Sequence, residues 1–182
     1  MRAFRQPFTL GKVDATLPCK RAAPVFEIVT PQSPADLAEI RHLLREYASG
    51  LAVDLYFQDF DSELLQLPGD YARPRGALLT ARVDRLLADC CPLQPLDSAD
   101  YPNVCEMKRL YVRTAFRERG LGRLLAETIL DLARQTGYAS VLLDTLSDME
   151  TARSLYMDLG FVEIPPCYHN PIPGSHYLRA QL

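Results

Sequence analysis

The chain has 182 residues, of which 48% are hydrophobic and 24% charged, a composition that suits a folded protein with a sizeable core. No apolar run approaches the roughly 20 residues that a membrane-spanning helix needs, and a net charge of −3 argues against general nucleic-acid binding. We therefore expect neither a membrane nor a nucleic acid as a partner.

The cysteines indicate a reducing environment and no metal. They number five, they show no C-x-x-C spacing, and Cys90 and Cys91 are adjacent, an arrangement that rarely suits a disulfide. Free thiols in a cytoplasmic protein are the simplest interpretation. Cys167 and His169 have side chains that can bind zinc, but no second ligand pair accompanies them in the sequence.

The first half of the chain reads as an extension followed by strands and helices. Residues 1–24 have no clear period and are predicted to be an N-terminal extension, and residues 25–182 a single domain. Ser33 and Asp36 have the spacing of a capping box at a helix start, and Gly50 is a natural stop. The expected elements are a strand at 25–30, a helix between Ser33 and Gly50, a short helix at 61–67, a hairpin of strands at 76–83 and 85–93, and a loop at 93–103.

The second half predicts a strand, a helix and a strand in an order that implies parallel pairing through a right-handed crossover. In the strand at 104–112, alternation places Leu110 and Val112 on the face of Glu106, and Tyr111 on the other face. The remaining expected elements are a helix from Leu121 to Gly137, a strand at 140–145, a helix that begins at a capping box of Ser147 and Glu150 and ends at Gly160, and closing strands at 161–164 and 176–182.

The turn Arg117-Glu118-Arg119-Gly120-Leu121-Gly122, between a strand and an amphipathic helix, is the most informative segment. Two glycines let the backbone approach a ligand closely, and the following helix directs unpaired N–H groups and a partial positive charge at the turn. Residues 108–123 carry a net charge of +5, whereas the rest of the chain carries −8. These features predict a site for a phosphate-bearing molecule.

Other interpretations of this turn fit less well. A glycine pair by itself is often a plain turn. A P-loop is excluded because no Gly-Lys-Ser/Thr follows, and Leu125 stands where a dinucleotide-binding G-x-G-x-x-G motif has its third glycine.

Two motifs resemble the GNAT superfamily of N-acetyltransferases. Arg117-x-x-Gly120-x-Gly122 matches the family's Arg/Gln-x-x-Gly-x-Gly/Ala signature, and Leu110-Tyr111-Val112 resembles the strand before it. The segment 152–161 resembles the family's later A-x-x-L-Y-x-x-x-G-F stretch. The resemblance implies an α/β (α+β) fold with a mixed, strongly twisted sheet and helices on both faces. It also implies an enzyme that moves an acetyl group from acetyl-CoA to an amine.

The resemblance also places the cosubstrate. It implies that amides from Glu118 to Arg123 hold the pyrophosphate of acetyl-CoA, that main-chain groups of Leu110 and Val112 pair with the pantetheine arm, and that the strands part just after Leu110. The acetyl carbonyl would be polarised by the amide of Leu110 or Tyr111. The expected cofactor-binding residues are therefore Leu110, Tyr111, Val112, Arg117, Glu118, Arg119, Gly120, Leu121, Gly122 and Arg123.

The sequence departs from the family's pattern at three positions. The family often has proline at the place of Thr114, and an asparagine commonly stands at the place of Met149. Glu118 replaces a frequent glycine and puts a negative charge beside the expected diphosphate. Unless Glu118 points to solvent or pairs with an arginine, cofactor affinity should suffer.

Glu106 and Tyr156 are the expected catalytic residues. Glu106 begins the strand that leads to the turn and is the candidate base, acting through a water, although a salt bridge with Lys108 or Arg109 is an equal alternative. Tyr156 is the candidate acid for the leaving thiolate, as the family's matching tyrosine is, and its helical spacing also fits a core residue. Asp144 as base, His169 and His176 as pocket residues, and Cys105 as nucleophile are weaker alternatives.

We expect direct acetyl transfer to a primary amine of a small molecule or peptide. Acceptor specificity should come from segments 56–71 and 165–176, which resemble the family least. The alternatives are a non-catalytic acyl-CoA-binding or regulatory module and a transferase that uses a longer acyl-CoA. Exposed strand edges of two copies can pair, so a homodimer is a further expectation that the sequence leaves undecided.

Overall fold

The computed structural model describes residues 26–51, 53, 55, 59–168 and 170–182. The predicted extension at 1–24 lies outside the described residues, so the domain boundaries stay a prediction. The predicted sheet is confirmed: it is mixed, has eight strands and runs in the order β1-β2-β3-β4-β6-β8-β7, with β5 paired to β3. The strands are β1 (Phe26–Val29), β2 (Ala77–Val83), β3 (Leu86–Pro95), β4 (Val104–Met107), β5 (Tyr111–Val112), β6 (Ser140–Leu146), β7 (Val162–Ile164) and β8 (Ser175–Gln181).

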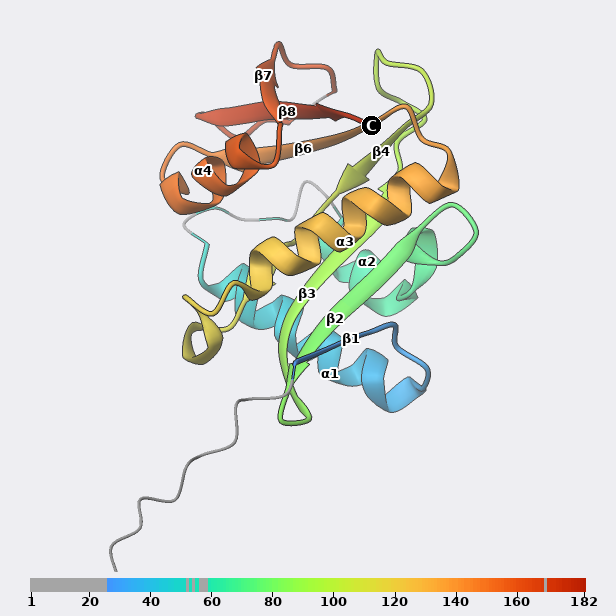
Figure 1. Ribbon diagram of the computed structural model, residues 1–182, viewed down its shortest axis with the longest axis vertical. Coiled ribbons are helices and arrows are strands. Elements are labelled where there is room, and N and C mark those ends of the chain that lie inside the picture. Colours follow the sequence, from blue (N-terminus) through green and yellow to red (C-terminus); the bar gives the residue numbers. More distant parts are fainter. Residues whose placement is uncertain (1–25, 52, 54, 56–58, 169) are drawn as a thin grey trace, which may run out of the picture.

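Helices cover both faces of the sheet, as expected (Figure 1). They are α1 (Pro34–Ser49), α2 (Phe60–Gln66), α3 (Leu121–Thr136) and α4 (Glu150–Asp158), with short 3-10 helices η2 (Gly69–Tyr71) and η3 (Thr114–Phe116). Buried residues of α3, including Leu125 and Ile129, pack with Cys91 of β3 in one core. The opposite core joins α1 and α2 to the same strand, so β3 is buried on both sides.

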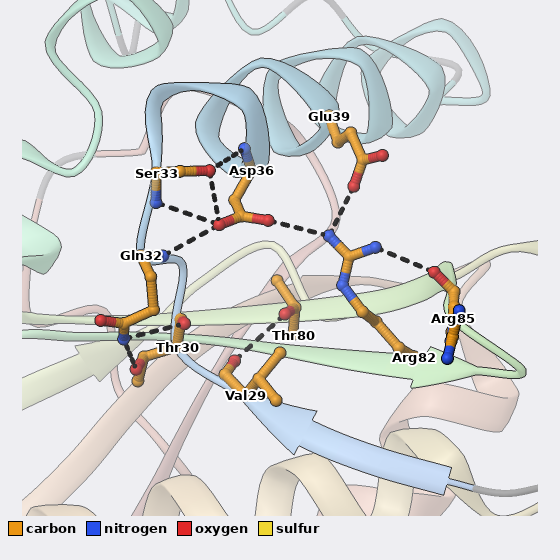
Figure 2. Close-up of polar contacts among 9 residues, drawn as sticks. All are labelled: Val29, Thr30, Gln32, Ser33, Asp36, Glu39, Thr80, Arg82 and Arg85. Carbon is orange, nitrogen blue, oxygen red and sulfur yellow. Dashed lines mark hydrogen bonds and ion pairs between the residues drawn. The ribbon is translucent and has the colours of Figure 1, made fainter.

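The start of α1 confirms the predicted capping box and shows how the helix is fixed to the sheet. The Ser33 hydroxyl accepts a hydrogen bond from the Asp36 amide, and the Asp36 carboxylate accepts one from the Ser33 amide. Figure 2 shows that Arg82 of β2 reaches the carboxylates of both Asp36 and Glu39, at 3.2 and 2.5 Å. Cap and ion pairs together hold the first turn of α1 against β2.

The predicted strand at 104–112 is interrupted, which corrects the assignment of its faces. Both β4 and β5 pair with β3, where Met107 lies opposite Leu93 and Tyr111 opposite Cys90. Between these pairs, three residues, 108–110, lie opposite only two residues of β3, 91 and 92. Arg109 adopts a left-handed φ of 52° there. An extra residue in one strand inverts the alternation beyond it. Leu110 and Val112 consequently pack in the core that contains Met107.

Two further expectations are corrected. β3 extends to Pro95, so the loop before β4 begins later than residue 93. Ser147 does not cap α4: the N-cap is Met149, without a side-chain hydrogen bond. The Ser147 hydroxyl instead donates to the carbonyl of Gly174 at 3.0 Å and lies 2.9 Å from Nε2 of His176. These contacts fix the loop before β8, and they outweigh the local capping preference.

Asp89, in the middle of β3, is a buried carboxyl whose side-chain oxygens have no hydrogen-bond partner among the described residues. It is 0% exposed. Burial raises the pKa of Asp89 from 3.8 to about 8, and the neighbouring amide of Cys90 opposes this only in part. A folded-state pKa above the unfolded value means that folding favours the protonated acid. The contribution of protonated Asp89 to the free energy of unfolding is fully present below pH 4, and it is lost as the pH rises to about 8.

Replacing Asp89 with asparagine should therefore stabilise the protein increasingly with pH. The gain over the wild type should be near zero at pH 4 and grow by about 1.4 kcal/mol per pH unit at most, levelling off near pH 8. Denaturant unfolding at several pH values measures it. The control is Asp97→Asn, because Asp97 is exposed, pairs with Arg75 and has a lowered pKa. A gain that does not grow with pH would contradict this role of Asp89.

Candidate active site

The predicted phosphate turn is formed by the start of α3. Gly120 is the N-cap of the helix, with a left-handed φ of 78°, and no side chain caps this end. Among the described residues, the first-turn amides of α3 therefore have no side-chain partner, and they can bind an anion. Gly122 lies against Val112: a Cβ on this glycine would be 3.2 Å from Cγ2 of Val112. Close packing of α3 on β5 thus explains the second glycine.

The arginines of the turn lie on its exposed surface. Arg117 stacks on the ring of Tyr111 at 6.0 Å, and its Nε donates to the carbonyl of Val112 at 3.1 Å. Arg119 stacks on Phe116 at 5.7 Å. Arg123 pairs with Asp158 of α4 at 2.8 Å. The carbonyl of Val112, one of the groups expected to bind pantetheine, therefore already accepts a hydrogen bond from Arg117.

Glu118 is exposed and has a left-handed φ of 62°. It forms no ion pair with a described residue. Exposure meets the condition that Glu118 points to solvent, so solvent screens the carboxylate and limits its effect on a bound diphosphate. The left-handed backbone still disfavours glutamate, because a Cβ costs energy in this conformation.

Substituting Glu118 should tighten CoA binding modestly, because a solvent-screened carboxylate keeps part of its repulsion of the diphosphate. Glu118→Gln removes only the charge and should lower the Kd for CoA severalfold. Glu118→Gly should do the same and also raise the free energy of unfolding by about 1 kcal/mol, because it relieves the backbone. Calorimetry and denaturant unfolding separate the two effects. An unchanged Kd in both variants would show that the Glu118 charge does not act on the ligand.

A pocket opens where the parallel strands part. β4 and β6 pair only from Val104 with Ser140 to Glu106 with Leu142, so the strands separate earlier than the predicted position after Leu110. The bulge lies directly beyond this pairing, between Met107 and Tyr111, where the chain stays paired with β3. On one side the pocket is lined by residues 107–109, and on the other by 144–146. It contains about 460 Å³ of space, part of it open to solvent.

Glu106 is buried beside this pocket but does not line it. It is 3% exposed, and its Oε2 accepts a hydrogen bond from Gln94 at 2.8 Å and lies 3.9 Å from the ammonium nitrogen of Lys108. Burial raises the pKa of Glu106, and the charge of Lys108 opposes the shift. Lys108 itself lines the pocket, so proton transfer from an acceptor to Glu106 requires an intervening water or a side-chain movement.

Tyr156 is a core residue of α4 whose hydroxyl has no partner among the described residues. It is 7% exposed and packs against Phe161, with ring centroids 5.7 Å apart. Burial raises the pKa of Tyr156 well above its usual range, so the phenol keeps its proton at all working pH values. Like Glu106, it is not among the described residues that line the pocket.

Arg109 and Glu63 form a buried pair that the sequence did not predict. Nη2 of Arg109 lies 2.7 Å from Oε2 of Glu63, and the hydroxyl of Tyr71 donates to the other oxygen at 2.6 Å. The guanidinium also stacks on Phe60 at 5.0 Å. These contacts tie α2 and η2 to the bulge, and they leave Lys108 as the cation beside Glu106.

The weaker candidates take different positions. Asp144 lines the pocket directly. The imidazole of His176 lies between Ser147 and Glu163, 2.7 Å from the latter, and His169 lies outside the described residues. Cys105 is fully buried, and burial raises the pKa of its thiol to about 12, which disfavours a nucleophilic role. The expected specificity segment 165–176 contributes Ile172 to the pocket, whereas residues 51, 53 and 55 line it in place of the described residues of 56–71.

The sequence also led us to expect free thiols, no metal site and no membrane-spanning helix. Cys90, Cys91, Cys105 and Cys167 are free and buried. Among the described residues, no group of three side chains is placed to hold a metal ion. In the same part of the chain, no helix has the length and apolar character needed to span a bilayer.

The geometry agrees with known proteins. The profile of the acetyltransferase (GNAT) family matches residues 37–161. The chain belongs to this family. An uncharacterized N-acetyltransferase of Schizosaccharomyces pombe is 39% identical over 150 residues, which cover 82% of this chain and 90% of that protein. The chain is accordingly an N-acetyltransferase, and the GNAT family transfers an acyl group from an acyl-CoA to an acceptor.

Solved structures share the fold. An acetyltransferase from Streptococcus agalactiae superposes with a TM-score of 0.69 at 21% identity, covering 86% of this chain and 98% of that one. The PaiA N-acetyltransferase from Thermoplasma acidophilum, in complex with coenzyme A, gives a TM-score of 0.66 at 16% identity, covering 87% and 99%.

Proposed function

We propose that this N-acetyltransferase uses acetyl-CoA and transfers its acetyl group directly to a primary amine of a small molecule or peptide. The observation that carries the proposal is the uncapped N-terminus of α3, which the short strand β5 connects to the pocket at residues 107–109. A diphosphate at Gly120 and a thioester between the parting strands fit this connection.

The residues near the pocket support direct transfer without a covalent intermediate. The described lining contains no cysteine, and Cys105 is a buried thiol. In the proposed reaction the N–C bond forms as the C–S bond of the thioester breaks. The amine loses a proton to Glu106 through water, and the departing thiolate receives one from Tyr156.

The Glu106 assignment predicts a specific pH dependence. The carboxylate is the active form, and burial raises its pKa above the ordinary value of 4.5, so kcat/KM should fall as the pH drops through that raised pKa. Glu106→Gln should lower kcat/KM by about 10²-fold or more and remove the part of the acidic limb that reflects the titration of Glu106. pH–rate profiles of both proteins measure it. The base assignment fails if the variant keeps the pH–rate profile of the wild type.

Measurement of free CoA tests the proposed function as a whole. The protein is incubated with acetyl-CoA or longer acyl-CoA donors and a panel of primary amines. Amine-dependent thiol release that is fastest with acetyl-CoA supports the proposal. Faster release with a longer donor would indicate a different acyl preference. Binding of acetyl-CoA without release for any amine would favour a non-catalytic module.

A further inference from the structure

The pocket contains one carboxylate whose charge no described cation balances. Lys108 lies 3.9 Å from Glu106, and Arg109 lies 2.7 Å from Glu63, so these charges compensate one another. Asp144 receives only neutral donors, the hydroxyl of Tyr168 at 3.0 Å and the side-chain amide of Asn170 at 2.7 Å. The net charge of these described groups is therefore negative, and the unbalanced negative charge is that of Asp144.

The position of Asp144 suits recognition of a ligand. It lies in β6, two residues beyond Leu142, the last residue paired with β4, and it projects on the same face as Glu106. Tyr168 and Asn170 come from the loop between β7 and β8 and bind one carboxylate oxygen each. Each oxygen keeps a further lone pair, so a cation in the pocket can be bound without breaking these contacts.

The rest of the lining is mainly apolar. The contributing side chains are Leu51, Val53, Leu55, Met107, Met149 and Ile172. Such walls favour the hydrocarbon part of a ligand. They contain no second unbalanced carboxylate among the described residues, so a second ammonium group would be desolvated without a partner.

We propose that Asp144 binds the ammonium group of the acceptor, that this group releases one proton to water before the neutral amine attacks, and that the acceptor is a primary monoamine with an apolar body. This inference rests on the proposed function and specifies its substrate class. An acceptor with a carboxylate next to its amine brings like charges together at Asp144 and is disfavoured. A short diamine is disfavoured because the apolar walls leave its second charge unpaired.

A matched pair of acceptors tests the class. 2-Phenylethylamine and phenylalanine differ by one carboxylate, and 1,4-diaminobutane and aspartate complete the panel. The release of free CoA gives kcat/KM for each acceptor. We expect kcat/KM for 2-phenylethylamine to be at least about tenfold higher than for phenylalanine, 1,4-diaminobutane or aspartate. A preference for phenylalanine, aspartate or the diamine would overturn the inference while the proposed function stands. No release with any amine would contradict the proposed function itself, and the inference with it.

Two variants test the residue. Asp144→Asn removes the charge and should raise KM for 2-phenylethylamine at least about tenfold, with a smaller effect on kcat. It should also reduce the ratio of kcat/KM for 2-phenylethylamine to kcat/KM for phenylalanine. The double substitution Tyr168→Phe with Asn170→Ala removes the loop contacts but keeps the charge, so the advantage should persist. Acetyl-CoA affinity should change little in either protein. An unchanged KM and an unchanged amine-to-amino-acid ratio in Asp144→Asn would refute the assignment.

Discussion

Replacing Tyr156 with phenylalanine should lower kcat by about 10²-fold or more while changing the Kd for acetyl-CoA little. The ring packs against Phe161 in the core, and phenylalanine preserves this packing. The hydroxyl has no partner within the described residues, so its loss leaves no buried group unpaired. Because burial raises the pKa of Tyr156, the hydroxyl stays protonated across the working pH range.

Tyr138→Phe is the matched control for this experiment. Tyr138 is also 7% exposed, but its hydroxyl donates to the carbonyl of Arg75 at 2.7 Å. Its removal should cost about 1 kcal/mol of stability and leave kcat nearly unchanged. Single-turnover measurements with saturating acetyl-CoA separate chemistry from binding. If Tyr156→Phe turns over as fast as the wild type, Tyr156 is a core residue only.

Gly76→Ala should be the most destabilising alanine substitution among the glycines that the structure describes. A Cβ at Gly76 would lie 2.1 Å from the carbonyl oxygen of Asp70 and 2.7 Å from main-chain atoms of Tyr71. Both neighbours are backbone atoms of η2, so the chain itself must move. We expect a loss of roughly 3 kcal/mol or more in the free energy of unfolding.

Gly137→Ala provides the comparison for Gly76→Ala. Gly137 ends α3 with a left-handed φ of 91°. Apart from its own neighbours in the chain, no atom of the described residues lies within 4 Å of the place that a Cβ would take. It should therefore lose only about 1 kcal/mol, from backbone strain alone. Denaturant unfolding of both variants measures the difference. Equal losses would show that η2 shifts without cost. Because Tyr71 binds Glu63, a shift of η2 should also disturb Arg109 at the pocket.

Elements set by local chemistry could be predicted from the sequence. The capping box at Ser33 begins α1, and the left-handed Gly137 ends α3, as their spacing indicated. The parallel pairing of β4 with β6 followed from the strand–helix–strand order. In each case the determining residues are close in sequence or follow from a general connection rule.

Features set by distant contacts could not be predicted. The segment 104–112 has a continuous strand pattern, and its interruption depends on how β3 pairs with both halves. Arg109 is 46 residues from Glu63, and Asp144 is 24 from Tyr168. No local spacing indicates such pairs. The roles of Glu106 and Tyr156 came from family resemblance and remain predictions, because burial and contacts do not by themselves show proton transfer.

The most direct test of the central claim compares CoA with pantetheine by calorimetry. Both contain the thiol arm, but only CoA has the diphosphate that the amides at the start of α3 are proposed to bind. The account predicts measurable binding of CoA and at least about 100-fold weaker binding of pantetheine. Equal affinities, or no heat with CoA from folded protein, would contradict it.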